Sequence, residues 1–76
     1  MYNLNERNCY IEIYRLTPRQ IEVLKYLALG LQNKQIAYEM GISISTVKLH
    51  LNGIYTRLRV NNRVQALLCA REHNII

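Results

Sequence analysis

The most regular pattern of apolar residues in the chain lies between Ser43 and Leu58. Aliphatic residues recur there at i, i+4, i+7 and i+11, namely Val47, Leu51, Ile54 and Leu58. This spacing places them on one side of an α-helix and predicts that the helix packs this row against a core. Ser43, which precedes the pattern, is a favoured N-cap residue.

An earlier helix is predicted from the residues that follow Leu16. Thr17-Pro18-Arg19-Gln20 has a hydroxyl at the N-cap, a proline at the first helical position and a glutamine three residues after the cap, which is the pattern of a capping box. The helix is expected to end near Gly30. Its apolar side is expected to consist of Ile21, Leu24, Leu27 and Ala28.

Two shorter helices complete the predicted set. One starts after Asn33 and ends at Gly41, and the other runs from about Arg63 to Glu72 with Asn61 or Asn62 as its cap. Four helices with short connections predict an all-α domain over residues 16–76. Residues 1–15 have no helical period and are assigned as a tail or linker. A short extended piece over 10–14, a linker from another domain and a tail packed on the core all fit them.

The second and third helices are separated only by Gly41-Ile42-Ser43. So short a turn forces two helices to cross steeply, and Gly41 provides the positive φ that redirects the chain. Ala37 is expected to be small because the third helix passes close to it. The pattern predicts a helix-turn-helix unit. The alternative is an ordinary helical hairpin with a glycine cap, which would have mixed charges on the outer side of its third helix.

Charge is distributed unevenly along the chain. The formal net charge is +5, and the stretch from Met40 to Arg71 has no acidic residue. Half of all the basic residues lie in that stretch, namely Lys48, Arg57, Arg59, Arg63 and Arg71. A long block of one sign favours a polyanionic partner, because clustered cations release the counterions of phosphates.

The outer side of the third helix, expected at about 44–58, has the chemistry of a groove-reading surface. It carries Ser45, Lys48, Leu49, Asn52 and Tyr55, and no carboxylate. A lysine can donate to guanine, an asparagine can pair with adenine, and an aliphatic side chain can contact the thymine methyl group. Thr46 is placed to bind a phosphate at the helix start, and Arg57 and Arg59 to contact the DNA backbone near its end.

Five motifs follow one another along the chain: Leu16-Thr17-Pro18-Arg19, Leu31-Gln32-Asn33-Lys34-Gln35-Ile36-Ala37, Gly41-Ile42-Ser43, Thr46-Val47-Lys48-Leu49-His50 and Asn62-Arg63-Val64-Gln65-Ala66. Together they resemble the LuxR/FixJ/GerE family of bacterial regulators, over residues 16–76. The resemblance implies a four-helix DNA-binding domain whose third helix enters the major groove and whose fourth helix forms a dimer.

Carried over by position, the resemblance implies specific roles for individual residues. The residues implied to contact bases are Lys48, Leu49 and Asn52. The residues implied to contact phosphates are Asn33, Lys34, Thr46, His50 and Arg57.

The chain departs from the family pattern at three positions. Gln20 stands where a glutamate is usual, and keeps the cap without the charge. Arg59 stands where a glycine is common, which predicts a different backbone and one more phosphate contact. Gly53 lies inside the third helix, where it either permits a close backbone approach or is simply tolerated.

The fourth helix is apolar almost all round, which supports a dimer independently of the resemblance. A terminal helix of so small a domain can bury only one side in its own core. A second copy is expected to cover the remaining stripe, and the alternative is that residues 1–15 fold back over it. The predicted interface consists of Val64, Leu67 or Leu68, and Arg71.

Other functional classes have less support. Neither His50 nor His73 has a nucleophile or carboxylate at motif spacing, and the chain has no Asp, so neither catalysis nor a cofactor is expected. The expected partners are double-stranded DNA, a second copy of the chain on DNA, and RNA polymerase or a larger regulator. The rival function is a protein-interaction module that dimerises with a full-length relative and blocks it. The acid-free outer side argues against this rival.

The sequence also predicts the compartment of the protein and the state of its two cysteines. No stretch reaches the ~20 apolar residues that a membrane helix needs, and residues 1–9 lack the apolar segment of a secretion signal. A cytoplasmic protein without membrane association is therefore expected. Cys9 and Cys69 have no metal-ligand spacing, and both are expected to be free thiols, with a structural disulfide as the less favoured alternative.

Overall fold

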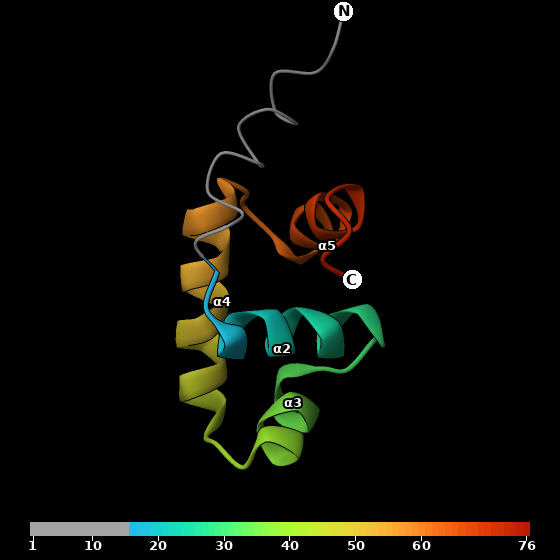
Figure 1. The fold of residues 1–76 in the computed structure, drawn as a ribbon. Coiled ribbons are helices and arrows are strands. Elements are labelled where there is room, and N and C mark those ends of the chain that lie inside the picture. Colours follow the sequence, from blue (N-terminus) through green and yellow to red (C-terminus); the bar gives the residue numbers. More distant parts are fainter. Residues whose placement is uncertain (1–15) are drawn as a thin grey trace, which may run out of the picture.

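The computed structural model describes residues 16–76, which form four helices and no strand. They are α2 (Pro18–Ala28), α3 (Asn33–Met40), α4 (Ile44–Leu58) and α5 (Arg63–Glu72). The predicted all-α architecture of this part of the chain is confirmed. In Figure 1, α4 stands along one side of the domain, α2 crosses it, and α3 and α5 lie on either side of α2. The predictions for residues 1–15 lie outside the described residues.

Helix α2 begins with the predicted capping box. Thr17 Oγ1 accepts a hydrogen bond from the Gln20 main-chain N–H at 3.1 Å, and Gln20 Oε1 accepts one from the Thr17 N–H at 2.9 Å. Pro18 occupies the first helical position. Two of the N–H groups at this end are therefore satisfied, and the glutamine performs the capping that a glutamate would.

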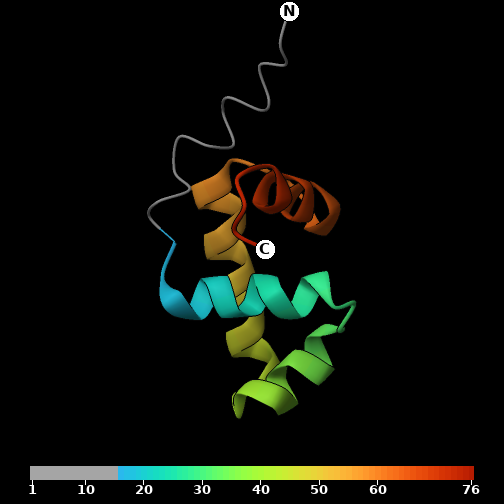
Figure 2. The ribbon, with the colours of Figure 1, turned by 45° about the vertical axis from the view of Figure 1, so that its right-hand side comes forward.

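The connection between α3 and α4 has the predicted turn geometry. Gly41 has φ 68° and ψ 35°, the left-handed conformation that glycine adopts without strain. The Ile42 N–H donates to the carbonyl of Ala37 at 3.0 Å, which closes the end of α3. Ser43 caps α4, because its Oγ accepts from the Thr46 N–H at 3.0 Å. The chain direction thus changes within a few residues, and α3 and α4 cross steeply (Figure 2).

Helix α5 is capped by Asn62, which decides between the two predicted candidates. Asn62 Oδ1 accepts from the Gln65 N–H at 2.9 Å. The main-chain N–H of Asn61 instead donates to Gln65 Oε1 at 2.8 Å. Gln65 therefore takes part in both bonds, and Asn61 lies outside the helix.

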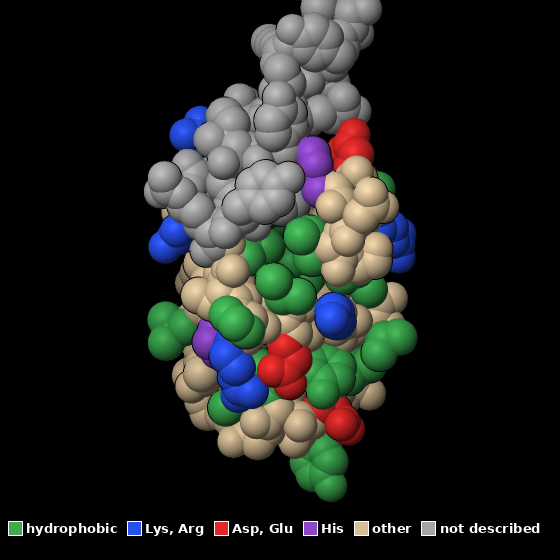
Figure 3. All heavy atoms as spheres, viewed as in Figure 1, with side chains coloured by type: hydrophobic (Ala, Val, Ile, Leu, Met, Phe, Trp, Pro, Cys, Tyr) green, Lys and Arg blue, Asp and Glu red, His purple; other side chains and the backbone are tan. Residues whose placement is uncertain are grey.

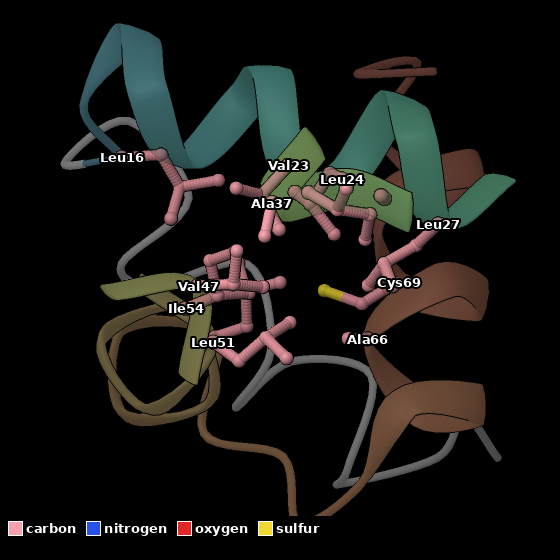
Figure 4. Packing of buried hydrophobic residues seen from close by; sticks show 13 residues of the cluster. Leu16, Val23, Leu24, Leu27, Ala37, Val47, Leu51, Ile54, Ala66 and Cys69 are labelled. Carbon is pink, nitrogen blue, oxygen red and sulfur yellow. The ribbon is translucent and has the colours of Figure 1, made fainter. Parts of the chain in front are cut away.

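The core consists of one buried cluster to which all four helices contribute (Figure 4). The row predicted for α4 is buried as expected, and α5 contributes the small residues Ala66, Cys69 and Ala70. The predicted apolar side of α2 is partly wrong. Val23 is fully buried with Leu24 and Leu27, whereas Ile21 and Ala28 are only half-buried. Helix α2 packs against α3, α4 and α5, so its buried sector is rotated toward Val23.

Cys69 corrects a second expectation. It is buried as predicted, with 3% of its surface exposed. It is disulfide-bonded, however, so the expectation of a free thiol at this position is wrong. Spacing along the sequence does not determine which thiols approach in space, and therefore could not settle this point. Cys9 lies outside the described residues.

The end of α4 corrects the expectation of a different backbone at Arg59. This residue has φ 58° and ψ 46°, the left-handed conformation that a glycine would adopt there. The Arg59 N–H donates to the carbonyl of Thr56, and the Val60 N–H donates to that of Tyr55 at 3.0 Å. The need to satisfy the last carbonyls of α4 imposes this geometry on a residue with a side chain.

We predict that glycine at position 59 gives a more stable domain than alanine. In the left-handed region a Cβ crowds the following carbonyl, and this cost exceeds the extra backbone entropy that glycine loses on folding. Arg59→Gly should exceed Arg59→Ala by about 0.5–1 kcal/mol in free energy of unfolding. Thermal unfolding of both variants measures the difference, expected at roughly 2–8 °C in Tm.

The matched control is Thr56, an exposed residue of α4 with ordinary helical geometry. There the order reverses, and alanine should be more stable than glycine by about 1 kcal/mol. If alanine were also favoured at position 59, the left-handed end of α4 would not persist in solution.

Candidate nucleic-acid interface

Helix α4 presents one side to the core and the other to solvent. Val47, Ile54 and Leu58 are fully buried, and Leu51 is nearly so. The other three helices lie on that side of α4, so no described helix covers its opposite flank (Figure 1). Residues predicted to read bases lie on this flank and are all exposed: Lys48, Leu49 and Asn52.

The composition of the exposed flank differs from the prediction at two positions. Tyr55 is half-buried and packs against the core. Ile44 is 42% exposed and was missed by the sequence analysis. Its position four residues before Lys48 is the signal that could have placed it on the same side of the helix. The flank therefore exposes two aliphatic side chains, Ile44 and Leu49, the latter 69% exposed.

The charge of the described residues favours an anionic partner at this flank. Helix α4 has no carboxylate, and Glu22, Glu39 and Glu72 lie on the other three helices. Glu22 is paired with Arg19, with 3.1 Å between Oε1 and Nη1. In the view of Figure 3 the visible acidic side chains lie over the middle and right of the domain, and the left edge below the grey atoms shows none. A negatively charged ligand would thus meet no carboxylate on α4.

The residues predicted to contact phosphates lie along α4 and at the start of α3. Thr46 is half-buried at the start of α4, and its Oγ1 lies 2.9 Å from Ser43 Oγ. His50 is half-buried in the middle of α4, and Arg57 is exposed in its last turn. Asn33 and Lys34 open α3, where Asn33 is half-buried and Lys34 is exposed. Two helix N-termini therefore contribute side chains, and the positive end of each helix dipole favours an anion.

A long-range contact at the start of α3 had no sequence signal. Arg63 of α5 donates through Nη2 to Asn33 Oδ1 at 2.6 Å and through Nη1 to the carbonyl of Leu31 at 3.3 Å. The two residues of the side-chain pair are thirty positions apart in sequence. Spacing rules describe neighbours on one helix and cannot predict such a pair.

Gly53 permits a close approach between α2 and α4. A Cβ built on Gly53 would lie 2.5 Å from Gln20 Nε2. Gln20 Oε1 is at the same time the acceptor of the capping bond from Thr17. Of the two interpretations of this glycine, close approach is the one that the geometry supports.

The described residues give no support to other kinds of site. Residues 16–76 contain no cluster of three or more His, Cys, Asp or Glu that could hold a metal ion. None of the helices described is long and apolar enough to cross a membrane.

Known proteins with similar sequences are bacterial regulators. The family model described as bacterial regulatory proteins, luxR family, matches residues 14–70. The chain is 42% identical over 66 residues to the response regulator protein VraR of Staphylococcus aureus, and equally to VraR of Staphylococcus saprophyticus and Staphylococcus epidermidis. The matched stretch is 86% of this chain but 32% of each of those proteins.

A solved structure shares the fold. The crystal structure of response regulator ChrA, from a heme-sensing two component system, matches with a TM-score of 0.78 and 46% identity. The match covers 80% of this chain and 30% of that chain. The chain thus spans about a third of the length of the relatives it matches.

We predict that Gly53 and Gln20 are energetically coupled. Gly53→Ala ordinarily stabilises a helix by about 1 kcal/mol. Here the new Cβ displaces the Gln20 carboxamide from Thr17, so about 0.5–1 kcal/mol of that gain is lost with the capping bond. In a Gln20→Ala background the full gain should return. Denaturant unfolding of the four proteins gives the coupling, and an equal gain in both backgrounds would contradict the contact.

Proposed function

The chain belongs to the LuxR family of bacterial regulatory proteins, and on that premise we propose that it regulates transcription by binding double-stranded DNA with α4 in the major groove. One observation carries the proposal. The exposed flank of α4 presents Lys48, Leu49 and Asn52 opposite a fully buried aliphatic row, and the helix has no carboxylate. An α-helix fits the major groove, where base pairs are distinguished by their donors, acceptors and methyl groups.

The base-reading roles follow from the chemistry of the three exposed side chains. The Lys48 ammonium donates to the acceptors O6 and N7 of guanine. The Asn52 carboxamide both donates and accepts, which matches adenine, and Leu49 contacts the thymine methyl group. Ile44 adds a second aliphatic contact at the start of the same flank.

Phosphate contacts fix the position of the domain on the duplex. Asn33 and Lys34 at the start of α3, and Thr46 at the start of α4, place donors beside helix N-termini, which attract anions. His50 and Arg57 extend the contact along α4. Such contacts carry most of the affinity and its salt dependence, and no direct sequence information.

Helix α5 supports binding as a homodimer. Val64 is 65% exposed and Leu68 is 59% exposed, one turn apart on α5, and Arg71 is exposed one turn further on. Leu67 is half-buried against the core, so the alternative stripe through Leu68 is the one proposed to pair. A two-fold pair of α5 helices presents two copies of α4 to half-sites about one DNA turn apart.

The proposed setting is the bacterial cytoplasm, where the DNA lies. VraR and ChrA are named as response regulators, and the chain spans about a third of each. A larger regulator and RNA polymerase are therefore the further partners that we propose.

The test of base reading separates it from phosphate binding. Lys48→Ala and Asn52→Ala should each relax the preference at one or two base pairs, at a cost of about 1–3 kcal/mol on the selected site. Sequences selected from random DNA supply the site, and titration at several salt concentrations supplies the affinities.

Arg57→Ala is the matched control on the same helix. It should weaken binding to selected and random duplexes alike, and reduce the slope of log affinity against log salt by about 1. If Lys48→Ala weakened both duplexes equally, Lys48 would not read bases.

A second test concerns the dimer. Leu68→Glu places a charge in the proposed α5 pair while leaving the core intact, because the side chain is 59% exposed. It should abolish cooperative binding to a duplex with two half-sites, with little change in binding to one half-site or in Tm. Gln65→Glu, also exposed on α5, introduces the same charge outside the proposed stripe.

The same measurements address the sequestering module. If the chain dimerises with a full-length relative but binds neither the selected nor the random duplex at any salt concentration, it blocks that relative and does not itself bind DNA.

A further inference from the structure

Arg63 makes a contact that its own helix does not explain. It is the first residue of α5, where the helix dipole disfavours a positive charge, and the first turn of α5 has no acidic residue to offset it. Its guanidinium reaches the start of α3, at 2.6 Å from Asn33 Oδ1 and 3.3 Å from the carbonyl oxygen of Leu31. In Figure 2 the start of α5 and the connection between α2 and α3 lie near the same end of α2.

This contact fixes the orientation of the Asn33 carboxamide. A guanidinium has donors only, so the oxygen of the amide must face Arg63. The amide nitrogen, with its two donors, is then directed away from Arg63. Asn33 is the first residue of α3, where the helix dipole has its positive end. A fixed amide at this end adds donors for an anion without the entropic cost of immobilising it on binding.

We propose that Arg63 is a positioning residue for the DNA contact at the start of α3, and that it acts through Asn33 without touching the DNA. The inference rests on the proposed function, since it assumes that Asn33 meets a phosphate. Two separate nitrogens of the Arg63 guanidinium, Nη1 and Nη2, donate to the two oxygens, and a lysine has no second nitrogen to reproduce this planar arrangement. The pair also joins α5, the proposed dimer helix, to α3.

The experiment is a double-mutant cycle in DNA binding. The affinities of the wild-type chain, Asn33→Ala, Arg63→Met and the double variant are measured on the selected duplex and on a random-sequence duplex. The temperature is kept well below the lowest Tm of the set, as checked by circular dichroism. Asn33→Ala and Arg63→Met should each weaken binding about fivefold on both duplexes, the effect of one hydrogen bond. In the Asn33→Ala background, Arg63→Met should change the affinity by less than about twofold.

Three further measurements separate positioning from charge and from stability. Arg63→Lys keeps the charge and should still lose most of the affinity that Arg63→Met loses. Arg63→Met should leave the slope of log affinity against log salt unchanged, whereas loss of a direct phosphate contact would lower it by about 1. Lys25→Met removes an equal charge from an exposed position of α2 and should have no effect.

The outcomes are distinguishable. If the two single effects multiply in the double variant, or if the salt slope falls with Arg63→Met, Arg63 does not act through Asn33. If Arg63→Met lowers Tm but not affinity, its role is structural only. If the wild-type chain binds neither duplex even at low salt, the proposed function fails together with this inference. If the wild-type chain binds DNA and Arg63→Met binds with the same affinity, the inference about Arg63 is wrong but the proposed function stands.

Discussion

The burial of one aliphatic row on α4 determines which side chains the domain can offer to a ligand. Val47, Ile54 and Leu58 are fully buried, and Leu51 nearly so. Each such side chain contributes about 1.5–3 kcal/mol when it leaves water. Any rotation of α4 about its axis would expose part of this row, at a cost far above the ~1 kcal/mol of a typical surface contact. The outward direction of Lys48, Leu49 and Asn52 is therefore a consequence of the core.

The ends of the helices define the remaining geometry. Gly41 and Ser43 let α4 start within a few residues of the end of α3, so the direction of α4 is set directly by the end of the preceding helix. The left-handed Arg59 ends α4 sharply and lets α5 return over α2 and α4. Helix α5 contributes mainly small side chains to the core and leaves the larger Val64 and Leu68 outside. Helix α5 thus has small buried side chains on its inner side and larger exposed apolar side chains on its outer side.

The sequence sufficed for features that depend on neighbours along the chain. Caps such as Thr17 and Ser43, the row of α4 and the exposure of Lys48, Leu49 and Asn52 follow from helical period and local hydrogen bonds. It did not suffice where distant elements meet. The burial of Val23, the partial burial of Tyr55 and the pair Arg63–Asn33 depend on how α2, α4 and α5 pack together. The DNA-contacting roles themselves remain predictions, because chemistry and exposure are compatible with them without requiring them.

The exposure of the α4 flank has an evolutionary consequence. Lys48, Leu49 and Asn52 are exposed and lie outside the buried cluster, so substitutions there change stability by only a few tenths of a kcal/mol, about ±0.5 at most. On the proposed base-reading role, target preference can therefore change among duplicated copies of such a domain with little penalty in folding. Gly53 lies on the same helix but faces Gln20, so a side chain at this position is coupled to the capping bond at Thr17. On the proposed function, retargeting such a domain is a matter of a few outward positions, because the core that holds α4 in place need not change.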